Sequence, residues 1–390
     1  MARILIVGAG IGGLAATALL EQAGFDVYTI ERAPRFGEVG AGVQLGPNAT
    51  RVLIRLGLEE EIRDLGVAPS HVSWLRWQDG NTLATMSMAE MESTFGTPYL
   101  TMYRPDLIDV LSSRVSTAEV RLGVAVSAVT EAAGRPAVEL GDGTVEAGDL
   151  VVGADGIHSG VRAQTVGDAA PRFSGMSAYR ARIARDALGF DDVVRNWMGP
   201  DRHLVAYPVG AGSAYLNIVA VVPEQEPTAE SWTMPGSADE LRSQFDGWCD
   251  NVQRIVGAVR DPVYRWALYD RDPLPRWSTA TTTLLGDACH PMLPFFAQGA
   301  AQAIGDAAAL TQALSAAPDD LSSALKRYEH ARLDHTARIQ RLSWDNNVFY
   351  HLPDGPEQRE RDAFLSGSSA IDTFSWLYGN DPFALGTPGV

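Results

Sequence analysis

A glycine-rich turn near the N-terminus constrains this chain more than any other feature. The sequence Gly8-Ala9-Gly10-Ile11-Gly12-Gly13 follows a short apolar run, residues 3–7, and precedes a helical pattern over residues 14–23. A GxGxxG sequence between a strand and a helix places backbone N–H groups where they can hold a pyrophosphate. Glu31 stands at the end of a second apolar run, where its carboxylate can accept hydrogen bonds from a ribose. The N-terminus therefore predicts a βαβ unit that binds a dinucleotide.

The glycine motif alone does not separate NAD from FAD. An NAD-dependent dehydrogenase is therefore one alternative that the N-terminus leaves open. The weaker alternative is a chance glycine-rich turn, in which Gly8, Gly10 and Gly13 only shape the chain and Glu31 is a solvated acid. Because strand, helix and acid all stand in the expected order, we favour the dinucleotide.

Chain length and charge exclude several classes of protein. The 390 residues suffice for one large domain or two closely joined ones, with room for an enclosed site. The net charge of −17 repels phosphate backbones, so nucleic acid is not an expected partner. Cys249 and Cys289 are too few for a disulfide framework, which fits a cytoplasmic protein.

No membrane span and no metal site are expected. No apolar stretch reaches the roughly 18 to 20 residues that a span needs, and glycines interrupt the apolar N-terminus that otherwise resembles a signal peptide. The two cysteines and the scattered histidines lack the spacing typical of metal ligands.

The remaining pattern predicts a mixed α/β chain. Asn48 is expected to cap a helix that ends near Leu56, and Asp79-Gly80 to turn a hairpin between residues 72–78 and 82–87. Extended, aromatic-bearing runs dominate residues 173–268 and predict a second sheet. Two helices are then expected, over residues 299–316 and 321–344.

Two later segments add specificity. Residues 149–162 contain Asp155-Gly156, and residues 283–291 contain Gly286-Asp287. With the N-terminal motif, in this order, they resemble the Asp-Gly and Gly-Asp motifs of the group A FAD-dependent aromatic hydroxylases. The likeness covers nearly the whole chain, including Trp376-Leu377-Tyr378-Gly379, and is closest to the salicylate, 3-hydroxybenzoate and 6-hydroxynicotinate hydroxylase branch.

The resemblance implies a cofactor and a reaction. A monooxygenase of this family would bind FAD, take electrons from NADH or NADPH, and use O2 to hydroxylate a small phenolic or N-heteroaromatic acid through a flavin C4a-hydroperoxide. The nicotinamide coenzyme would visit only transiently and would need no second dinucleotide fold. A monomer or a homodimer is expected. A monooxygenase of a larger natural product, hydroxylase or epoxidase, and a noncatalytic flavin-binding protein are the alternatives.

The resemblance also implies an arrangement of domains. A discontinuous Rossmann-like FAD-binding domain would be joined to a sheet-based substrate domain, with helices toward the C-terminus. The FAD-binding domain would comprise residues 1–70, 101–172 and 273–345. The substrate domain would comprise a hairpin in residues 71–100 and residues 173–272, and residues 346–390 would form a C-terminal tail.

Most of the FAD contacts are carried over from the family. Asp287 would bind the ribityl chain, Asp155 would lie by the pyrophosphate, and Arg104 would lie near the phosphates, where a guanidinium is a natural partner. The helix that begins at Gly299 would point its positive end at the flavin. The predicted FAD-binding residues are Gly8, Gly10, Gly13, Glu31, Arg32, Arg104, Asp155, Asp287, Pro294, Gly299 and Ala300. The alternatives are a turn acid for Asp155 and a surface ion pair for Arg104.

Three residues are predicted to contact the substrate. His203 and Tyr207 are four apart in an extended run, which places both on one face of a strand. By resemblance His203 would accept the phenolic proton and Tyr207 would orient the ring, although a lone strand histidine is more often structural. Gln44 stands where the 6-hydroxynicotinate enzymes carry a histidine, and Gln cannot act as a base. No arginine is assigned to a substrate carboxylate, although Arg76, Arg180 and Arg182 lie in plausible regions.

Overall fold

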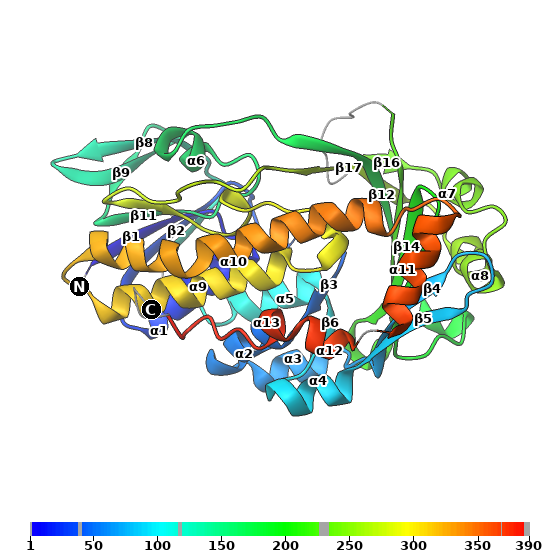
Figure 1. Cartoon of the computed structure of the whole chain (residues 1–390). Coiled ribbons are helices and arrows are strands. Elements are labelled where there is room, and N and C mark those ends of the chain that lie inside the picture. Colours follow the sequence, from blue (N-terminus) through cyan, green and yellow to red (C-terminus); the bar gives the residue numbers. More distant parts are fainter. Residues whose placement is uncertain (1, 38–40, 116–118, 226–233, 368, 386–390) are drawn as a thin grey trace.

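A parallel sheet of five strands forms one half of the molecule (Figure 1). The computed structural model describes residues 2–37, 41–115, 119–225, 234–367 and 369–385. The strand order is β18-β11-β1-β2-β7, and every neighbouring pair is parallel. The strands are β1 (Arg3–Val7), β2 (Asp26–Glu31), β7 (Glu119–Leu122), β11 (Leu150–Gly153) and β18 (Thr282–Leu284). Helix α1 (Ile11–Gln22) connects β1 to β2, so the predicted βαβ unit and the α/β fold class are confirmed.

A twisted sheet of eight strands forms the other half. Its order is β16-β17-β12-β15-β14-β13-β4-β5, and only the β13–β4 pair is parallel. The predicted hairpin is confirmed by the antiparallel pairing of β4 with β5. The strands are β4 (His71–Arg76), β5 (Thr82–Ser87), β12 (Arg172–Ala184), β13 (Val194–Gly199), β14 (Arg202–Val209), β15 (Tyr215–Pro223), β16 (Pro235–Gly236) and β17 (Val263–Asp270).

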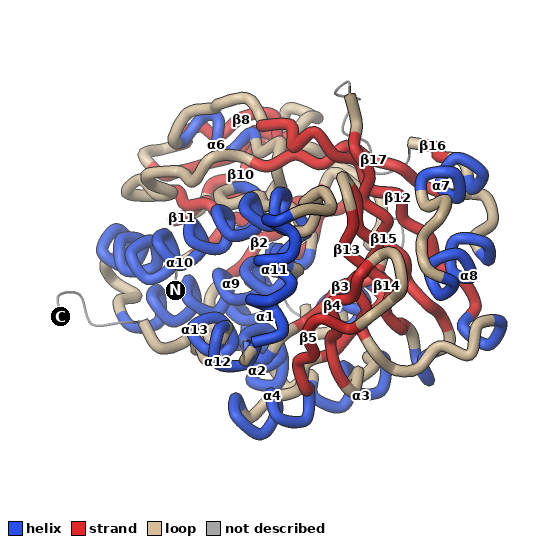
Figure 2. Tube along the Cα trace, turned by 45° about the vertical axis from the view of Figure 1, so that its right-hand side comes forward, coloured by secondary structure: helices blue, strands red, loops and turns tan. Residues whose placement is uncertain are grey.

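Side chains alternate along β14 between the outer and the inner face of the large sheet. Leu204 and Ala206 belong to the apolar core that also contains residues of α7 (Ala238–Gln244) and α8 (Asp250–Ala258). Figure 2 shows these two helices on the outer side of the sheet. His203, Val205 and Tyr207 point to the opposite face, toward the parallel sheet. The period of two therefore places the predicted His and Tyr on the same inner face, with Val205 between them.

Smaller elements complete the fold. Two further sheets are formed by β3 (Gly42–Leu45) with β6 (Leu100–Tyr103), and by β8 (Val126–Ala132), β9 (Arg135–Leu140) and β10 (Val145–Ala147). The shorter helices are α2 (Pro47–Arg55), α3 (Glu59–Leu65), α4 (Met88–Phe95), α5 (Arg104–Ser112), α6 (Gly160–Thr165), α11 (Pro356–Gly367), α12 (Ala370–Thr373) and α13 (Ser375–Tyr378). Single 3-10 turns are η1 (Arg185–Ala187), η2 (Ala211–Ser213), η3 (Gly286–Ala288) and η4 (Pro294–Phe296). Among the described helices, none is both long and apolar enough to cross a membrane.

Two long helices, α9 (Gly299–Ala316) and α10 (Leu321–Phe349), lie side by side along the molecule (Figure 1). The alanines of α9 allow it to pack closely against both α1 and α10. A buried ion pair joins the two helices, because Arg332 Nε of α10 donates to Asp306 Oδ1 of α9 at 2.7 Å. The other oxygen of Asp306 accepts from Gly286 N at 2.9 Å and lies 2.5 Å from His290 Nε2. Asp306 thus ties α9, α10 and the turn after β18 together.

The structure corrects two local predictions. Asn48 does not cap α2: the N-cap is Gly46, because Pro47 takes the first helical position, where its fixed φ and missing N–H are favourable. Asn48 instead donates from Nδ2 to Gln298 Oε1 at 3.0 Å. The last long helix does not end at Trp344 but continues to Phe349, since its final turn packs beside the large sheet.

The Asp306 network makes a testable contribution to stability. Burial alone would raise the pKa of Asp306, but His290 and Arg332 outweigh it and lower the pKa to about 2. Asp306→Asn leaves a buried guanidinium without its counter-charge, and we expect a loss of about 3–5 kcal/mol in the free energy of unfolding. Because the folded-state pKa is depressed, the wild-type contribution is present above about pH 4 and is lost as the pH falls toward 2. Denaturant unfolding at several pH values measures both effects.

Asp272→Asn is the matched control for this measurement. Asp272 is 81% exposed and pairs with Arg172 at the surface. Its removal should cost less than about 1 kcal/mol. Equal losses in the two variants would contradict the special role of Asp306.

Candidate active site

A first cavity, of about 630 Å³, lies between the parallel sheet and the inner face of the large sheet. It begins at the glycine turn after β1 and reaches His203 and Tyr207 on β14. Of the residues predicted to bind FAD, Gly13 alone does not line it; those that do are Gly8, Gly10, Glu31, Arg32, Arg104, Asp155, Asp287, Pro294, Gly299 and Ala300. Segments far apart in the sequence therefore form one wall.

The three predicted glycines have different structural reasons. Gly8 has φ +104°, and a Cβ on it would lie 2.4 Å from Ala154 O. A Cβ on Gly13 would lie 1.9 Å from Gly8 O, so this glycine lets α1 pack against the turn. A Cβ on Gly10 would meet no described atom within 4 Å, although Gly10 lines the cavity. The bare surface at Gly10 and the uncapped N-terminus of α1 fit the close approach of a phosphate.

Two predicted carboxylates are held by backbone groups. Glu31 accepts from Ala9 N at 2.7 Å and from Ala33 N at 2.8 Å, which fixes the acid beside the glycine turn. Asp155 accepts from Ser159 Oγ at 2.5 Å and from Val161 N at 3.1 Å, at the start of α6. The carboxylate of Asp155 therefore orders its own turn as well as lining the cavity.

Charged side chains gather where the cavity passes between the sheets. Burial raises the pKa of Asp287, and the charges of His290 and Arg104 oppose the rise. Burial lowers the pKa of Arg180 to about 10, while Tyr207 opposes the fall. Arg180 also lies over Trp266, 4.1 Å from the ring centroid. A diphosphate and a flavin ring would meet both charge and apolar surface here.

The N-terminus of α9 opens into the same cavity. Gly299 and Ala300 line it, and no side chain caps this helix. The N-cap residue of this helix is Gln298. Its Oε1 accepts from Asn48 Nδ2 at 3.0 Å and from Gln302 Nε2 at 2.8 Å. The free N–H groups and the positive end of α9 therefore face the cavity and can stabilise an anionic group.

A second cavity, of about 680 Å³, adjoins the first across the loop that contains Pro294. The residues common to both walls are Gln44, His203, Val205, Pro294, Phe295 and Ala297. Most of the second wall is apolar or aromatic, and no Lys or Arg is found among its described residues. Two side chains of its wall, Val348 and Phe364, are 62% and 57% exposed and form an apolar rim. This cavity is suited to an aromatic ring.

The three predicted substrate residues all line the first cavity, and two of them, Gln44 and His203, also line the second. Tyr99 donates from its hydroxyl to Gln44 Oε1 at 2.6 Å, and the Gln44 amide lies against the Tyr207 hydroxyl. Burial raises the pKa of Tyr207 to about 12, so it is a neutral hydroxyl at working pH. Burial and the neighbouring His351 lower the pKa of His203 well below its ordinary value. His203 is therefore a neutral imidazole, with a ring nitrogen lone pair that can accept a hydrogen bond.

Sequence reasoning missed the immediate partners of this group. His351 contacts His203 at 2.7 Å between Nε2 and Nδ1, although 148 residues separate them. Tyr99 and His351 carry no motif that could have revealed them. Arg180 was one of three candidate arginines. Arg76 is paired with Asp354 and Asp362, and Arg182 lies against the rings of Tyr103 and Tyr215. Of the three, Arg180 alone lines the first cavity.

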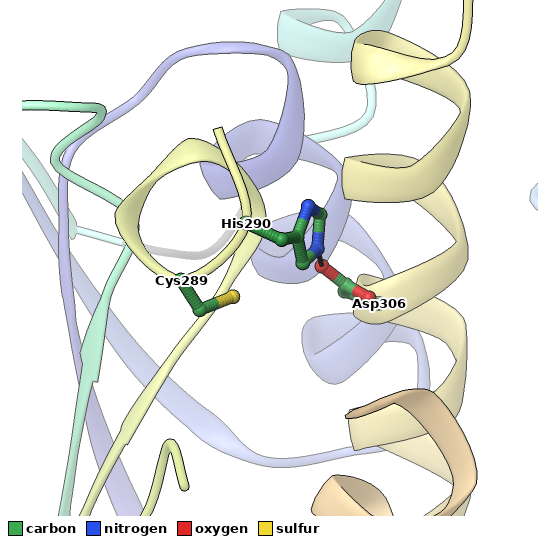
Figure 3. Close-up of side chains that lie close together, drawn as sticks. All are labelled: Cys289, His290 and Asp306. Atoms are coloured by element: carbon green, nitrogen blue, oxygen red, sulfur yellow. Dashed lines mark hydrogen bonds and ion pairs between the residues drawn. The ribbon is translucent and has the colours of Figure 1, made fainter. Parts of the chain in front are cut away.

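Cys289, His290 and Asp306 lie close enough together to hold a metal ion (Figure 3). Their interactions already engage the ligand atoms, however. Asp306 uses both oxygens for Arg332, His290 and Gly286 N, and Cys289 Sγ lies 3.2 Å from Gly286 O. His290 points to Asp306 and does not line either cavity. The group is therefore a structural hydrogen-bond network beneath the first cavity.

Comparison with known proteins agrees with this geometry. A family model described as an FAD binding domain matches residues 1–343. The chain belongs to the FAD-dependent aromatic hydroxylases. It is 39% identical to a 3-amino-4-hydroxybenzoate 2-monooxygenase of Streptomyces platensis, over 99% of this chain and 98% of that protein. It is 38% identical to the 6-hydroxynicotinate 3-monooxygenase of Bordetella bronchiseptica, over 88% and 91%.

A solved structure agrees as well. This chain superposes on the structure of a salicylate hydroxylase in a substrate complex with a TM-score of 0.83 and 25% sequence identity. The match covers all of this chain and 99% of the salicylate hydroxylase chain. The predicted family branch and the FAD cofactor are thus confirmed. The alternatives of an NAD-dependent dehydrogenase and of a monooxygenase for a larger natural product are not favoured.

The glycine geometry leads to a paired prediction about FAD. Gly10→Ala should weaken FAD binding roughly tenfold or more, because a methyl group would occupy the phosphate's approach, while the apoprotein loses less than about 1 kcal/mol for a poorer N-cap. Gly13→Ala should destabilise the apoprotein by about 3 kcal/mol, because its methyl group collides with Gly8 O. Thermal denaturation of the apoprotein and titration of FAD fluorescence separate the effects. A Gly10→Ala protein that binds FAD normally would refute this division.

Proposed function

We propose that this hydroxylase adds one oxygen atom to a small aromatic acid that carries a phenolic hydroxyl, with NADH or NADPH as electron donor and O2 as oxidant. One observation carries the proposal: His203, a neutral buried imidazole, lies in the wall that the FAD cavity shares with the apolar cavity. A ring in the apolar cavity can reach both His203 and the flavin edge.

Bound FAD supplies the redox chemistry, because a flavin reduced by a nicotinamide coenzyme can deliver one atom of O2 to an electron-rich ring. The residues of the chain prepare the ring. His203 accepts the phenolic proton, which makes the ring more nucleophilic. Tyr207 stays protonated and offers its hydroxyl to a ring substituent, while Gln44, held by Tyr99, positions Tyr207. The apolar wall keeps bulk water away from the reacting centre.

We assign the FAD-binding residues the same roles that the family resemblance implies for them. Gly8, Gly10, Glu31 and Arg32 would hold the adenosine and diphosphate side, while the N-terminus of α9 at Gly299 would face the flavin ring. Arg104, Asp155 and Asp287 would act between these ends. Pro294 would shape the loop between flavin and substrate.

The substrate class rests on relatives and on charge. The relatives act on 3-amino-4-hydroxybenzoate and 6-hydroxynicotinate, which are small aromatic acids with a ring hydroxyl or its tautomer. Since the described wall of the second cavity has no Lys or Arg, neutral donors such as Tyr378 and Asn196 would contact the acid group there. Arg180, in the first cavity, contributes a positive charge near Tyr207.

The direct test measures NADH and NADPH oxidation by the purified holoenzyme. The panel contains 3-amino-4-hydroxybenzoate, 6-hydroxynicotinate, 3-hydroxybenzoate and salicylate, and the products are identified by mass. At least one acid should stimulate coenzyme oxidation and give a product heavier by one oxygen, or by one oxygen less a carboxyl group. Yellow protein that oxidises neither coenzyme faster with any member of the panel would contradict the proposal.

Substitution at His203 tests the assigned base. His203→Gln keeps hydrogen bonding but removes the proton acceptor, so kcat should fall by roughly 10²- to 10⁴-fold while FAD stays bound. Tyr207→Phe should lose less, because the hydroxyl only orients the ring. Rates and product per coenzyme oxidised are compared for both variants. A His203→Gln enzyme with wild-type turnover would remove His203 from the reaction.

A further inference from the structure

The two buried histidines, His203 and His351, form a pair that the proposed reaction does not yet explain. His203 lies on β14, and His351 follows the C-terminus of α10. His351 Nε2 lies 2.7 Å from His203 Nδ1, and His351 Nδ1 lies 2.7 Å from Asn347 O. Phe295 packs edge-on against both rings, with centroids at 5.2 Å and 5.7 Å. The pair is held in one arrangement.

Hydrogen-bond accounting fixes the proton positions in this pair. Asn347 O is a backbone carbonyl and can only accept, so His351 Nδ1 must carry the proton. Burial lowers the pKa of His351 to about 4, so its ring is neutral at working pH and Nε2 is an acceptor. His203 Nδ1 must then donate to it. The lone pair of His203 is left on Nε2, the ring nitrogen available to the cavities that His203 lines.

We infer that His351 is a positioning residue, which fixes the tautomer of His203 so that Nε2 is the proton acceptor for the substrate hydroxyl. This inference rests on the proposed function. His351 lines neither cavity, so it can act on the substrate only through His203. In the opposite tautomer the cavity would meet an N–H group, which cannot take a proton from a phenol.

The groups around His351 favour an acceptor over a proton store. His203 faces it from β14, and Arg361 of α11 disfavours positive charge on it. Arg361 Nη2 is itself paired with Asp362 at 2.8 Å. His351 therefore stays neutral and holds His203 through the Nδ1 hydrogen bond while His203 carries the substrate proton.

Two substitutions separate positioning from packing. His351→Leu removes the acceptor, whereas His351→Gln can place an amide oxygen near the former Nε2. With the acid that responds in the panel above, His351→Leu should lower kcat roughly 10- to 100-fold, part of what a positioned base contributes, with little change in KM. His351→Gln should restore most of the rate. His330→Gln, at an exposed position of α10, is the control.

A tautomer measurement tests the inference without any substrate. Long-range 1H–15N correlation spectra of the holoenzyme with 15N-labelled histidines distinguish protonated from unprotonated ring nitrogens, and His203→Gln assigns the His203 signals. We expect protonated Nδ1 and unprotonated Nε2 in the wild type, and a mixture in His351→Leu. A His203 ring protonated on Nε2, an unchanged tautomer in His351→Leu, or no rescue by Gln in a folded enzyme would overturn the inference. A failed panel with the expected tautomer would count against the proposed function alone.

Discussion

The ion pair between Asp306 and Arg332 is the interaction on which the two cavities depend. It joins α9 to α10, and through Gly286 and His290 it also fixes the turn that follows β18. The N-terminus of the same α9 has no side-chain cap and lines the first cavity, and the same turn carries Asp287. Because both carboxylate oxygens and the guanidinium are engaged, this buried pair meets the condition under which such pairs persist.

Helix α10 connects this ion pair to the region of His351 at the large sheet. From Arg332 to its end at Phe349 it spans roughly 25 Å, and His351 follows after the C-cap residue Tyr350. A rigid helix held at the FAD side thus presents His351 to His203 on the large sheet. The loop of Pro294 and Phe295 closes the space between them and belongs to both cavities. The proposed cofactor site and the proposed substrate site therefore share the same rigid elements.

The two cavities differ in their electrostatic character. The first contains Arg104, Arg180 and Asp287 together with helix N-termini, all suited to a charged cofactor. The second is lined mostly by apolar and uncharged polar groups, with Asp345 as an acidic residue of its wall, and burial lowers the pKa of His203 there. A low-dielectric pocket strengthens hydrogen bonds at the few polar atoms it contains. His203 lines both cavities and therefore lies between the charged and the apolar surroundings.

The sequence by itself determined the parts that depend on local spacing. Short-range geometry predicted the GxGxxG turn, the place of Glu31 and the common strand face of His203 and Tyr207. The two later motifs identified the family. Only the tertiary structure decided which distant residues meet. His351, Tyr99 and Arg180 have no motif, and Asn48 left its expected cap because Pro47 begins the helix and Gln298 offers a partner. Local chain geometry depends on neighbouring residues, and the sequence shows these directly. The tautomer of the buried His203 depends instead on a hydrogen bond to a residue 148 positions away, which only the packing of the fold brings into contact.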